Sequence, residues 1–66
     1  MLIGPNIREL RRKKNLTQYE LAQVVNKDVS TISKIETNKA KPSIQTLKLI
    51  AEALETTMSE LINEKA

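Results

Sequence analysis

The sequence predicts a single all-α domain built from five short helices. Glycine and proline occur only once and twice among the 66 residues, while Leu, Ile, Glu, Lys, Gln and Ala dominate, and these residues favour helices. Apolar residues recur at helical spacing, and no stretch alternates apolar and polar residues as a half-buried strand does. No repeat and no linker divides the sequence, so we expect one unit over residues 1–66.

The first helix is predicted to begin at Pro5 or Asn6 and to end around residues 14–15. Proline is favoured in the first helical turn because its missing N–H would have no helical partner there. Asn6 has Glu9 three residues after it, which is the spacing of a capping box. For the basic run at residues 11–14 a DNA patch, a membrane-surface patch and solvated surface are alternatives, and we favour solvated surface that attracts anions at long range.

The second helix is predicted over about residues 18–25, with Thr17 as its N-cap and Glu20 completing a capping box. A third helix follows Asp28, a residue type that is favoured at N-caps. Because only a few residues join these two helices, they cannot lie antiparallel over any length and must cross steeply. The sequence therefore predicts a helix-turn-helix motif at about residues 17–36.

The fourth helix is expected to begin after Ser43, its N-cap, because Pro42 favours extended backbone in the residue before it. This helix has the clearest apolar stripe of the chain: Leu47, Ile50, Ala51 and Leu54. Thr57, with Glu60 three residues later, predicts a short fifth helix. The last two helices together cover about residues 43–63.

The composition excludes several kinds of chemistry. The chain has no cysteine and no histidine, so disulfides cannot form and the usual ligands of zinc, haem and iron–sulfur clusters are missing. The carboxylates are scattered over separate predicted helices, and we expect no enzyme activity, no cofactor and no metal. No segment reads as a signal peptide or a membrane span. A reducing cytoplasm suits such a chain.

Charge and chain length point to a partner. Residues 1–48 contain ten Lys or Arg and four Asp or Glu, a net charge of +6, whereas residues 49–66 carry one Lys and four Glu, a net charge of −3. A chain this short, with a thin aliphatic core, is marginally stable alone, so we expect self-association. The predicted contact between two copies is at the acidic C-terminal end and involves Met58, Leu61 and Ile62.

Several motifs carry a resemblance to a known family. They are Thr17-Gln18-Tyr19-Glu20-Leu21-Ala22, then Ser30-Thr31-Ile32-Ser33-Lys34-Ile35-Glu36, then Lys39 and Pro42-Ser43. With these motifs the chain resembles the XRE or Cro/C1-type phage-repressor family, without gaps from Gly4 to about Ile62. The resemblance implies a lambda-repressor-like domain of five helices that binds double-stranded operator DNA as a homodimer, with the third helix in the major groove.

The third helix has an outward face that suits base reading. At 100° per residue, with Ile32 and Ile35 facing inward, the outward residues are Ser30, Ser33 and Lys34, and Val29 and Thr31 flank them. Lysine can donate to guanine O6 and N7, and valine can contact a thymine methyl group. We therefore expect the base-reading residues to be Val29, Ser30, Thr31, Ser33 and Lys34.

The resemblance also implies residues that contact the DNA backbone or support the fold. The expected phosphate contacts are Thr17, Gln18, Thr37, Asn38, Lys39 and Lys41. The resemblance further implies that Gln18 braces the reading helix and that Arg11 and Glu36 form an ion pair between the first and third helices. Departures from the family pattern are Asn26 and Lys27 in the turn, where Lys27 must extend to solvent, and Glu55 and Thr56 before the fifth helix.

Two functions remain open from the sequence. The first is a sequence-specific transcription regulator, a repressor or an autoregulating controller, that binds a palindromic operator as a homodimer. The alternative is a protein-interaction module, such as an antitoxin or antirepressor, that uses the same fold. The basic body with an opposed acidic end favours the first function.

Overall fold

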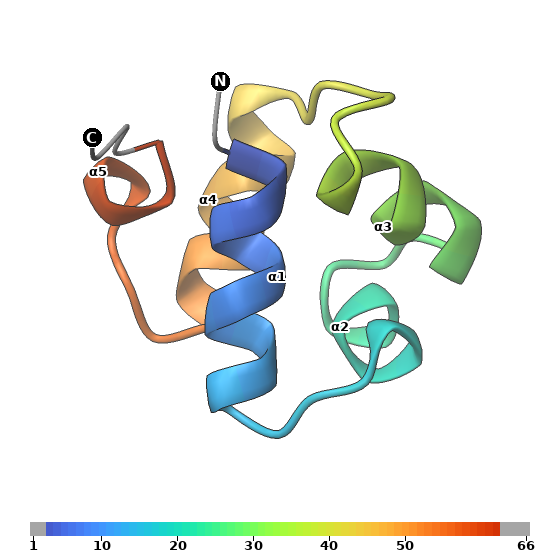
Figure 1. Cartoon of the computed structure of the whole chain (residues 1–66), viewed down its shortest axis with the longest axis horizontal. Helices are drawn as coiled ribbons and strands as arrows, with labels where there is room; N and C mark the ends of the chain where they lie inside the picture. The colour runs from blue at the N-terminus through green and yellow to red at the C-terminus, as the bar shows by residue number, and fades with distance from the viewer. Residues whose placement is uncertain (1–2, 63–66) are drawn as a thin grey trace.

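The computed structural model describes residues 3–62, which form five helices without a strand among them. They are α1 (Ile3–Lys13), α2 (Gln18–Val24), α3 (Val29–Glu36), α4 (Ile44–Ala53) and α5 (Met58–Leu61). The helix α1 lies at the centre, with α2 and α3 on one side and α5 on the other (Figure 1). Direct packing joins α1 to α3 and α5, and α4 to α2 and α5. The predicted all-α fold of five helices is confirmed.

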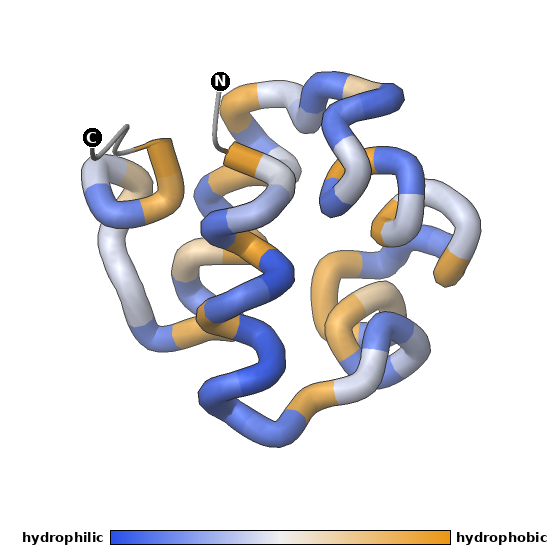
Figure 2. Tube along the Cα trace, viewed as in Figure 1, coloured by the Kyte–Doolittle hydropathy of each residue, from blue (hydrophilic) through white to orange (hydrophobic). Residues whose placement is uncertain are grey.

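Aliphatic side chains from all five helices form one core. The largest fully buried side chains are Ile7, Leu21, Val25, Ile32, Ile50 and Leu61. Figure 2 shows hydrophobic positions recurring among hydrophilic ones along α1 to α4, as expected for helices that bury one face. Leu61 has 0% of its surface exposed, so the prediction that Leu61 contacts a second copy is wrong. Its side chain is already used by the core of one chain.

The start of α1 differs from the prediction. The helix begins at Ile3, two residues before Pro5, and Pro5 still lies in the first turn, where its N–H is not needed. The predicted capping box of Asn6 and Glu9 is wrong because Asn6 lies inside the helix. Instead, the Asn6 side-chain amide donates a hydrogen bond of 2.9 Å to the carbonyl of Leu61 and so ties α1 to α5.

Three of the other helix starts have the predicted side-chain caps. The Thr17 hydroxyl accepts from the Glu20 N–H at 3.0 Å, and the Glu20 carboxylate accepts from the Thr17 N–H at 2.8 Å, which confirms that capping box. The hydroxyls of Ser43 and Thr57 each accept from the N–H three residues later, at 3.1 Å. Such caps satisfy N–H groups that have no partner within the helix.

Four helices end with the same backbone device. The residue after the C-cap of α1, α2, α3 and α4 has a positive φ, at Asn15 (60°), Asn26 (59°), Asn38 (62°) and Glu55 (54°). The N–H of the next residue then bonds to the carbonyl five positions earlier, over 2.8–3.1 Å, which is the Schellman arrangement. Asparagine tolerates this left-handed conformation, whereas glutamate is strained in it. The expected left-handed Asn26 in the turn is confirmed.

Glu55 therefore marks the most strained of these helix ends. Its carboxylate pairs with the Lys14 ammonium, which lowers the pKa of Glu55, but both side chains reach solvent. An exposed ion pair contributes little to stability. We expect Glu55→Gly to raise the free energy of unfolding by about 1 kcal/mol, because glycine adopts a positive φ without strain.

Thermal or urea unfolding measures this change. The matched control is Glu55→Gln, which removes the ion pair but keeps a side chain at the left-handed position, and it is expected to leave stability the same or slightly lower. If Glu55→Gly is no more stable than Glu55→Gln, the positive φ at Glu55 does not strain the backbone.

Among residues 3–62, no helix is long and apolar enough to cross a membrane. Within the same residues, no three acidic side chains come together in a group that could hold a metal ion.

Candidate nucleic-acid interface

Interactions between residues close in the sequence determine where α2 begins and ends before α3. The capping box at Thr17 starts α2, and left-handed Asn26 ends it after Val25 has entered the core. The backbone N–H of Lys27 closes the turn on the Ala22 carbonyl at 2.9 Å, and the Lys27 side chain is exposed, as predicted. The turn residue types thus bring α3 directly against α2 (Figure 1).

The helix α3 is amphipathic and turns one polar face outward. Ile32 and Ile35 are 1% and 2% exposed and pack in the core. On the outer side, Ser30 and Lys34 are exposed, and Val29 at the tip of the helix is 43% exposed. Of the five predicted base-reading residues, the other two, Thr31 and Ser33, are half-buried. A small hydroxyl-bearing surface of this kind can approach base edges closely.

Asp28 is the N-cap residue of α3, as predicted, but its side chain does not act as a cap, because it makes no bond to the backbone there. Instead, one carboxylate oxygen accepts from the Thr31 hydroxyl at 2.5 Å, and the other accepts from the Ser30 hydroxyl at 3.4 Å. The bond from Thr31 is the main cause of a lowered pKa of Asp28, since it stabilises the ionised carboxylate. The residue type of Asp28 predicts only a helix start and gives no sign of these bonds to Ser30 and Thr31.

A buried ion pair fixes the far end of α3. The Arg11 guanidinium donates from Nε and Nη2 to the two carboxylate oxygens of Glu36, at 2.6 and 3.1 Å, and the Glu36 side chain is 1% exposed. The Gln18 side-chain amide donates to the same carboxylate at 3.0 Å, and Arg11 Nη1 donates to the Leu16 carbonyl at 2.7 Å. The expected ion pair is confirmed, and so is the bracing of α3 by Gln18. These bonds connect α1, the start of α2 and the end of α3.

A close backbone approach supports the same junction. Gly4 is buried, and a Cβ atom there would lie 2.5 Å from the Ile35 carbonyl oxygen and 2.6 Å from that of Glu36. The Gly4 N–H donates to the Asn38 side-chain oxygen at 3.1 Å. Only glycine lets α1 come this close to the end of α3.

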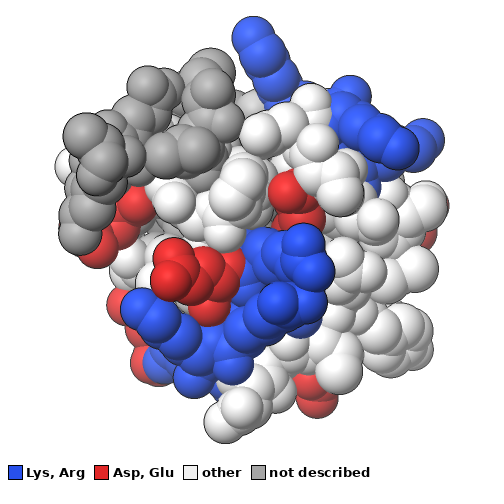
Figure 3. Space-filling model, viewed as in Figure 1, with Lys and Arg blue, Asp and Glu red and all other residues white. Residues whose placement is uncertain are grey.

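The predicted phosphate contacts fall into two groups. The first group already makes hydrogen bonds within the chain. Thr37 donates to the Ser33 and Lys34 carbonyls at 2.9 and 3.3 Å. Thr17 belongs to the capping box of α2, Gln18 donates to Glu36, and Asn38 accepts from Gly4. Lys39 and Lys41, in the loop after α3, have exposed side chains. Figure 3 shows Lys and Arg gathered over α1 and beside this loop, with a largely uncharged surface over α2 and α3.

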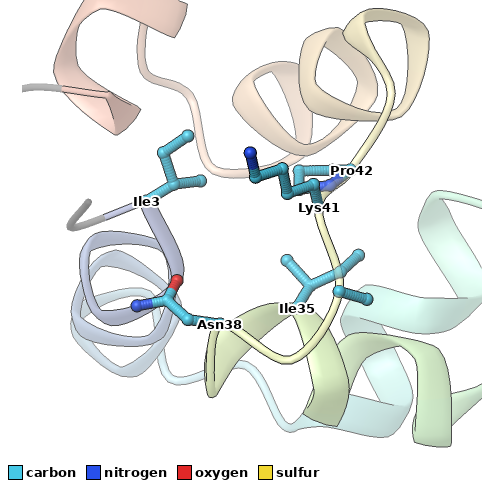
Figure 4. A pocket seen from close by; sticks show the side chains of 6 residues that line it. Ile3, Ile35, Asn38, Lys41 and Pro42 are labelled. Carbon is cyan, nitrogen blue, oxygen red and sulfur yellow. The ribbon is translucent and has the colours of Figure 1, made fainter.

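A shallow pocket of about 300 Å³ lies beneath this loop. Its lining includes Ile3, Ile35, Asn38, Lys41 and Pro42, and the Lys41 side chain reaches across it toward Ile3 (Figure 4). Pro42 restricts the backbone where the loop passes into the cap of α4. The loop therefore leaves α3 in a defined direction, with Lys39 and Lys41 exposed along it.

The removal of one partner of the ion pair tests its role. We expect Arg11→Met to lower the free energy of unfolding by about 3–5 kcal/mol, because it leaves the Glu36 carboxylate buried without its cation. The double variant Arg11→Met/Glu36→Leu should recover most of this loss, since neither charge then remains buried. Urea unfolding of Arg11→Met, Glu36→Leu and the double variant measures the coupling free energy between the two side chains. Additive losses would show that the pair does not act as a unit.

The comparisons with known proteins agree with this geometry. A family model described as helix-turn-helix matches residues 7–61, so the chain belongs to this family, and the resemblance to XRE-type repressors is confirmed. The immunity repressor of Bacillus phage phi105 is 34% identical over 65 residues, which are 98% of this chain and 45% of that protein. The chain spans between 31% and 59% of the length of three curated relatives that it matches.

Two solved structures were determined with DNA. The P22 c2 repressor in complex with a synthetic operator superposes with a TM-score of 0.91 at 26% identity, and the match covers 98% of both chains. The second is SinR, a master regulator for biofilm formation, in complex with DNA. It superposes with a TM-score of 0.86 at 32% identity, and the match covers 92% of this chain and 98% of that one. Both are similar to this chain over its helix-turn-helix and its flanking helices.

Proposed function

We propose that this chain is a DNA-binding module of a transcription regulator, a repressor or autoregulating controller that acts in the cytoplasm. The observation that carries the proposal is the outward face of α3, with exposed Ser30, Lys34 and Val29 on a helix that a buried ion pair holds in place. The P22 c2 repressor, which has nearly the same fold, is solved with an operator. In the proposed complex α3 lies in the major groove.

Phosphate contacts surround this reading face in the proposal. Lys39 and Lys41 are the cationic contacts, because their side chains are exposed in the loop at the end of α3. The proposed polar contacts to phosphates are Thr17, Gln18, Thr37 and Asn38. Cations on phosphates supply affinity that depends on salt, whereas contacts to base edges supply sequence preference. The two sets of residues should therefore be separable by mutation.

Two lysine variants separate base reading from phosphate binding. We expect Lys34→Ala to weaken binding to the best DNA sequence by about 1–3 kcal/mol and to relax the preference at one base pair, because a donor to guanine is lost. Lys39→Ala should weaken binding to all sequences alike and lower the slope of log affinity against log salt by about one. Selection from a random DNA pool, followed by titration of the recovered sequence at several salt concentrations, measures both effects.

Lys48→Ala is the matched control, since Lys48 is an exposed lysine on α4, outside the proposed interface. It should leave the recovered sequence unchanged and lower the salt slope by less than Lys39→Ala does. Recovery of no consensus from the random pool would contradict the regulator and favour the protein-interaction module.

We further propose that two copies bind a palindromic operator as a homodimer. Met58 is half-buried and Ile62 is 47% exposed, so both can contribute apolar surface to a contact at the end of α5. Leu61 belongs to the core and takes no part in this proposal. Two recognition helices about 34 Å apart would place the half-sites about one DNA turn apart.

Ile62→Ser tests the proposed contact. It should weaken self-association by about 1–2 kcal/mol, because less apolar surface is buried between the two copies. Sedimentation at micromolar concentrations measures the monomer–dimer equilibrium. Ile44→Ser is the matched control, since Ile44 is an equally apolar residue, 69% exposed, at the start of α4. A chain that stays monomeric both free and on its selected DNA would contradict the homodimer.

A further inference from the structure

The carboxylate of Asp28 accepts hydrogen bonds from the hydroxyl groups of Ser30 and Thr31. Each hydroxyl has one hydrogen to donate and two lone pairs. Thr31 gives its hydrogen to one carboxylate oxygen over 2.5 Å, and Ser30 gives its hydrogen to the other over 3.4 Å. The side-chain oxygens of Asp28 and Thr31 therefore offer only acceptors to a ligand, and the Ser30 hydroxyl, whose contact with Asp28 is long, joins them at the start of α3. We name these three residues the acceptor cluster.

We propose that the acceptor cluster makes Asp28 a specificity-determining residue that selects cytosine in the major groove. This inference rests on the proposed function, because it assigns one base of the DNA that α3 is proposed to read. In the major groove cytosine presents its N4 amino group as a donor, whereas guanine O6 and N7 and thymine O4 are acceptors. Adenine has an amino group too, but its N7 acceptor lies beside it. A surface of acceptors alone thus fits cytosine best.

The charge of Asp28 argues against a contact with the DNA backbone. A carboxylate repels phosphates, so its presence at the tip of a proposed reading helix lowers affinity for DNA in general. A hydrogen bond from a cytosine amino group offsets this repulsion only at the matching base pair. Such a residue works by excluding wrong sequences as well as by binding the right one.

The surroundings of Asp28 leave the carboxylate available to a ligand. Its side chain is exposed and makes no backbone cap. It borders a shallow groove between α2 and α3 whose lining includes Tyr19, Gln23, Lys27 and Val29. An aspartate with its ordinary pKa is already ionised at neutral pH and has no hydrogen to donate, and the bond from Thr31 lowers the pKa of Asp28 further. Asp28 thus stays an acceptor under the conditions of DNA binding.

The reading face then has two ends of opposite character. Asp28 precedes α3, and exposed Ser30 lies in its first turn, while the exposed Lys34 ammonium, which only donates, follows one turn later on the outward side. Acceptors select cytosine and a donor selects guanine, at different base pairs. Each half-site is therefore expected to contain a cytosine assigned to Asp28 and a guanine assigned to Lys34.

Selection from a random DNA pool with the wild-type chain and with Asp28→Asn tests the inference. Asparagine keeps the size of the side chain and is a good N-cap, but it is neutral and prefers adenine, whose N6 and N7 it contacts together. We expect the preference for cytosine at one position of each half-site to be about tenfold weaker in the variant than in the wild-type chain, with a shift toward adenine. The variant should bind random DNA at least as well as the wild-type chain does. Thermal unfolding of both proteins verifies that the variant is folded.

The control is Glu52→Gln, which removes one exposed negative charge on α4, and it should leave every base preference unchanged. A wild-type chain that recovers a consensus, with Asp28→Asn recovering the same base preferences at every position, would overturn the role of Asp28 alone. Equal weakening of all sequences by Asp28→Asn would also overturn it, since Asp28 would then be structural. Failure of the wild-type chain to recover any consensus would instead overturn the proposed function, and this inference with it.

Discussion

The ion pair between Arg11 and Glu36 is the contact on which the orientation of α3 depends. Its two hydrogen bonds, together with the bond from Gln18, join three helices at one carboxylate with a side chain that is 1% exposed. Buried charges are tolerated only when their partners are in place. The helix α3 can therefore adopt few other positions without the loss of this pairing. Gly4 allows the backbones of α1 and α3 to meet beside it.

This rigid junction explains how a small aliphatic core can present a reading helix. The core fixes α3 through Ile32 and Ile35 along its inner face, and the ion pair fixes its end. A proposed base-reading face must be held within a few tenths of an ångström to discriminate among base edges. In the proposed complex, the exposed lysines of the loop after α3 would add attraction to phosphates beside the largely uncharged surface over α2 and α3 (Figure 3).

Much of the fold was predictable because its signals are local. Thr17 with Glu20, Ser43 and Thr57 mark three helix starts through bonds that span three residues, and Asn26 marks a helix end through its own φ. The errors involve contacts between distant parts of the chain. Asn6 reads as a cap from its spacing to Glu9, but its partner in the structure is the Leu61 carbonyl, 55 positions away.

The candidate site shows the same division between local and distant signals. Helical periodicity predicted that Ser30 and Lys34 point outward, and both are exposed. The ion pair of Arg11 and Glu36 was available only from the family resemblance, because no local pattern connects residues 25 positions apart. Asp28 is a local exception: its residue type predicts a side-chain cap, but its carboxylate bonds hydroxyls two and three residues later, and residue type and spacing do not distinguish the two arrangements. The burial of Leu61 depends on how α5 packs against α1 and α4.

In the proposed complex, α3 and the loop after it form the surface that meets DNA. Backbone amide shifts of the labelled chain, recorded by NMR during titration with a short duplex at moderate salt, test this most directly. We expect the largest changes at residues 28–34 and 37–41, with smaller changes at residues 17–19 and little change on the outer face of α4. Changes concentrated on α4 and α5, with residues 28–34 unaffected, would contradict this proposal.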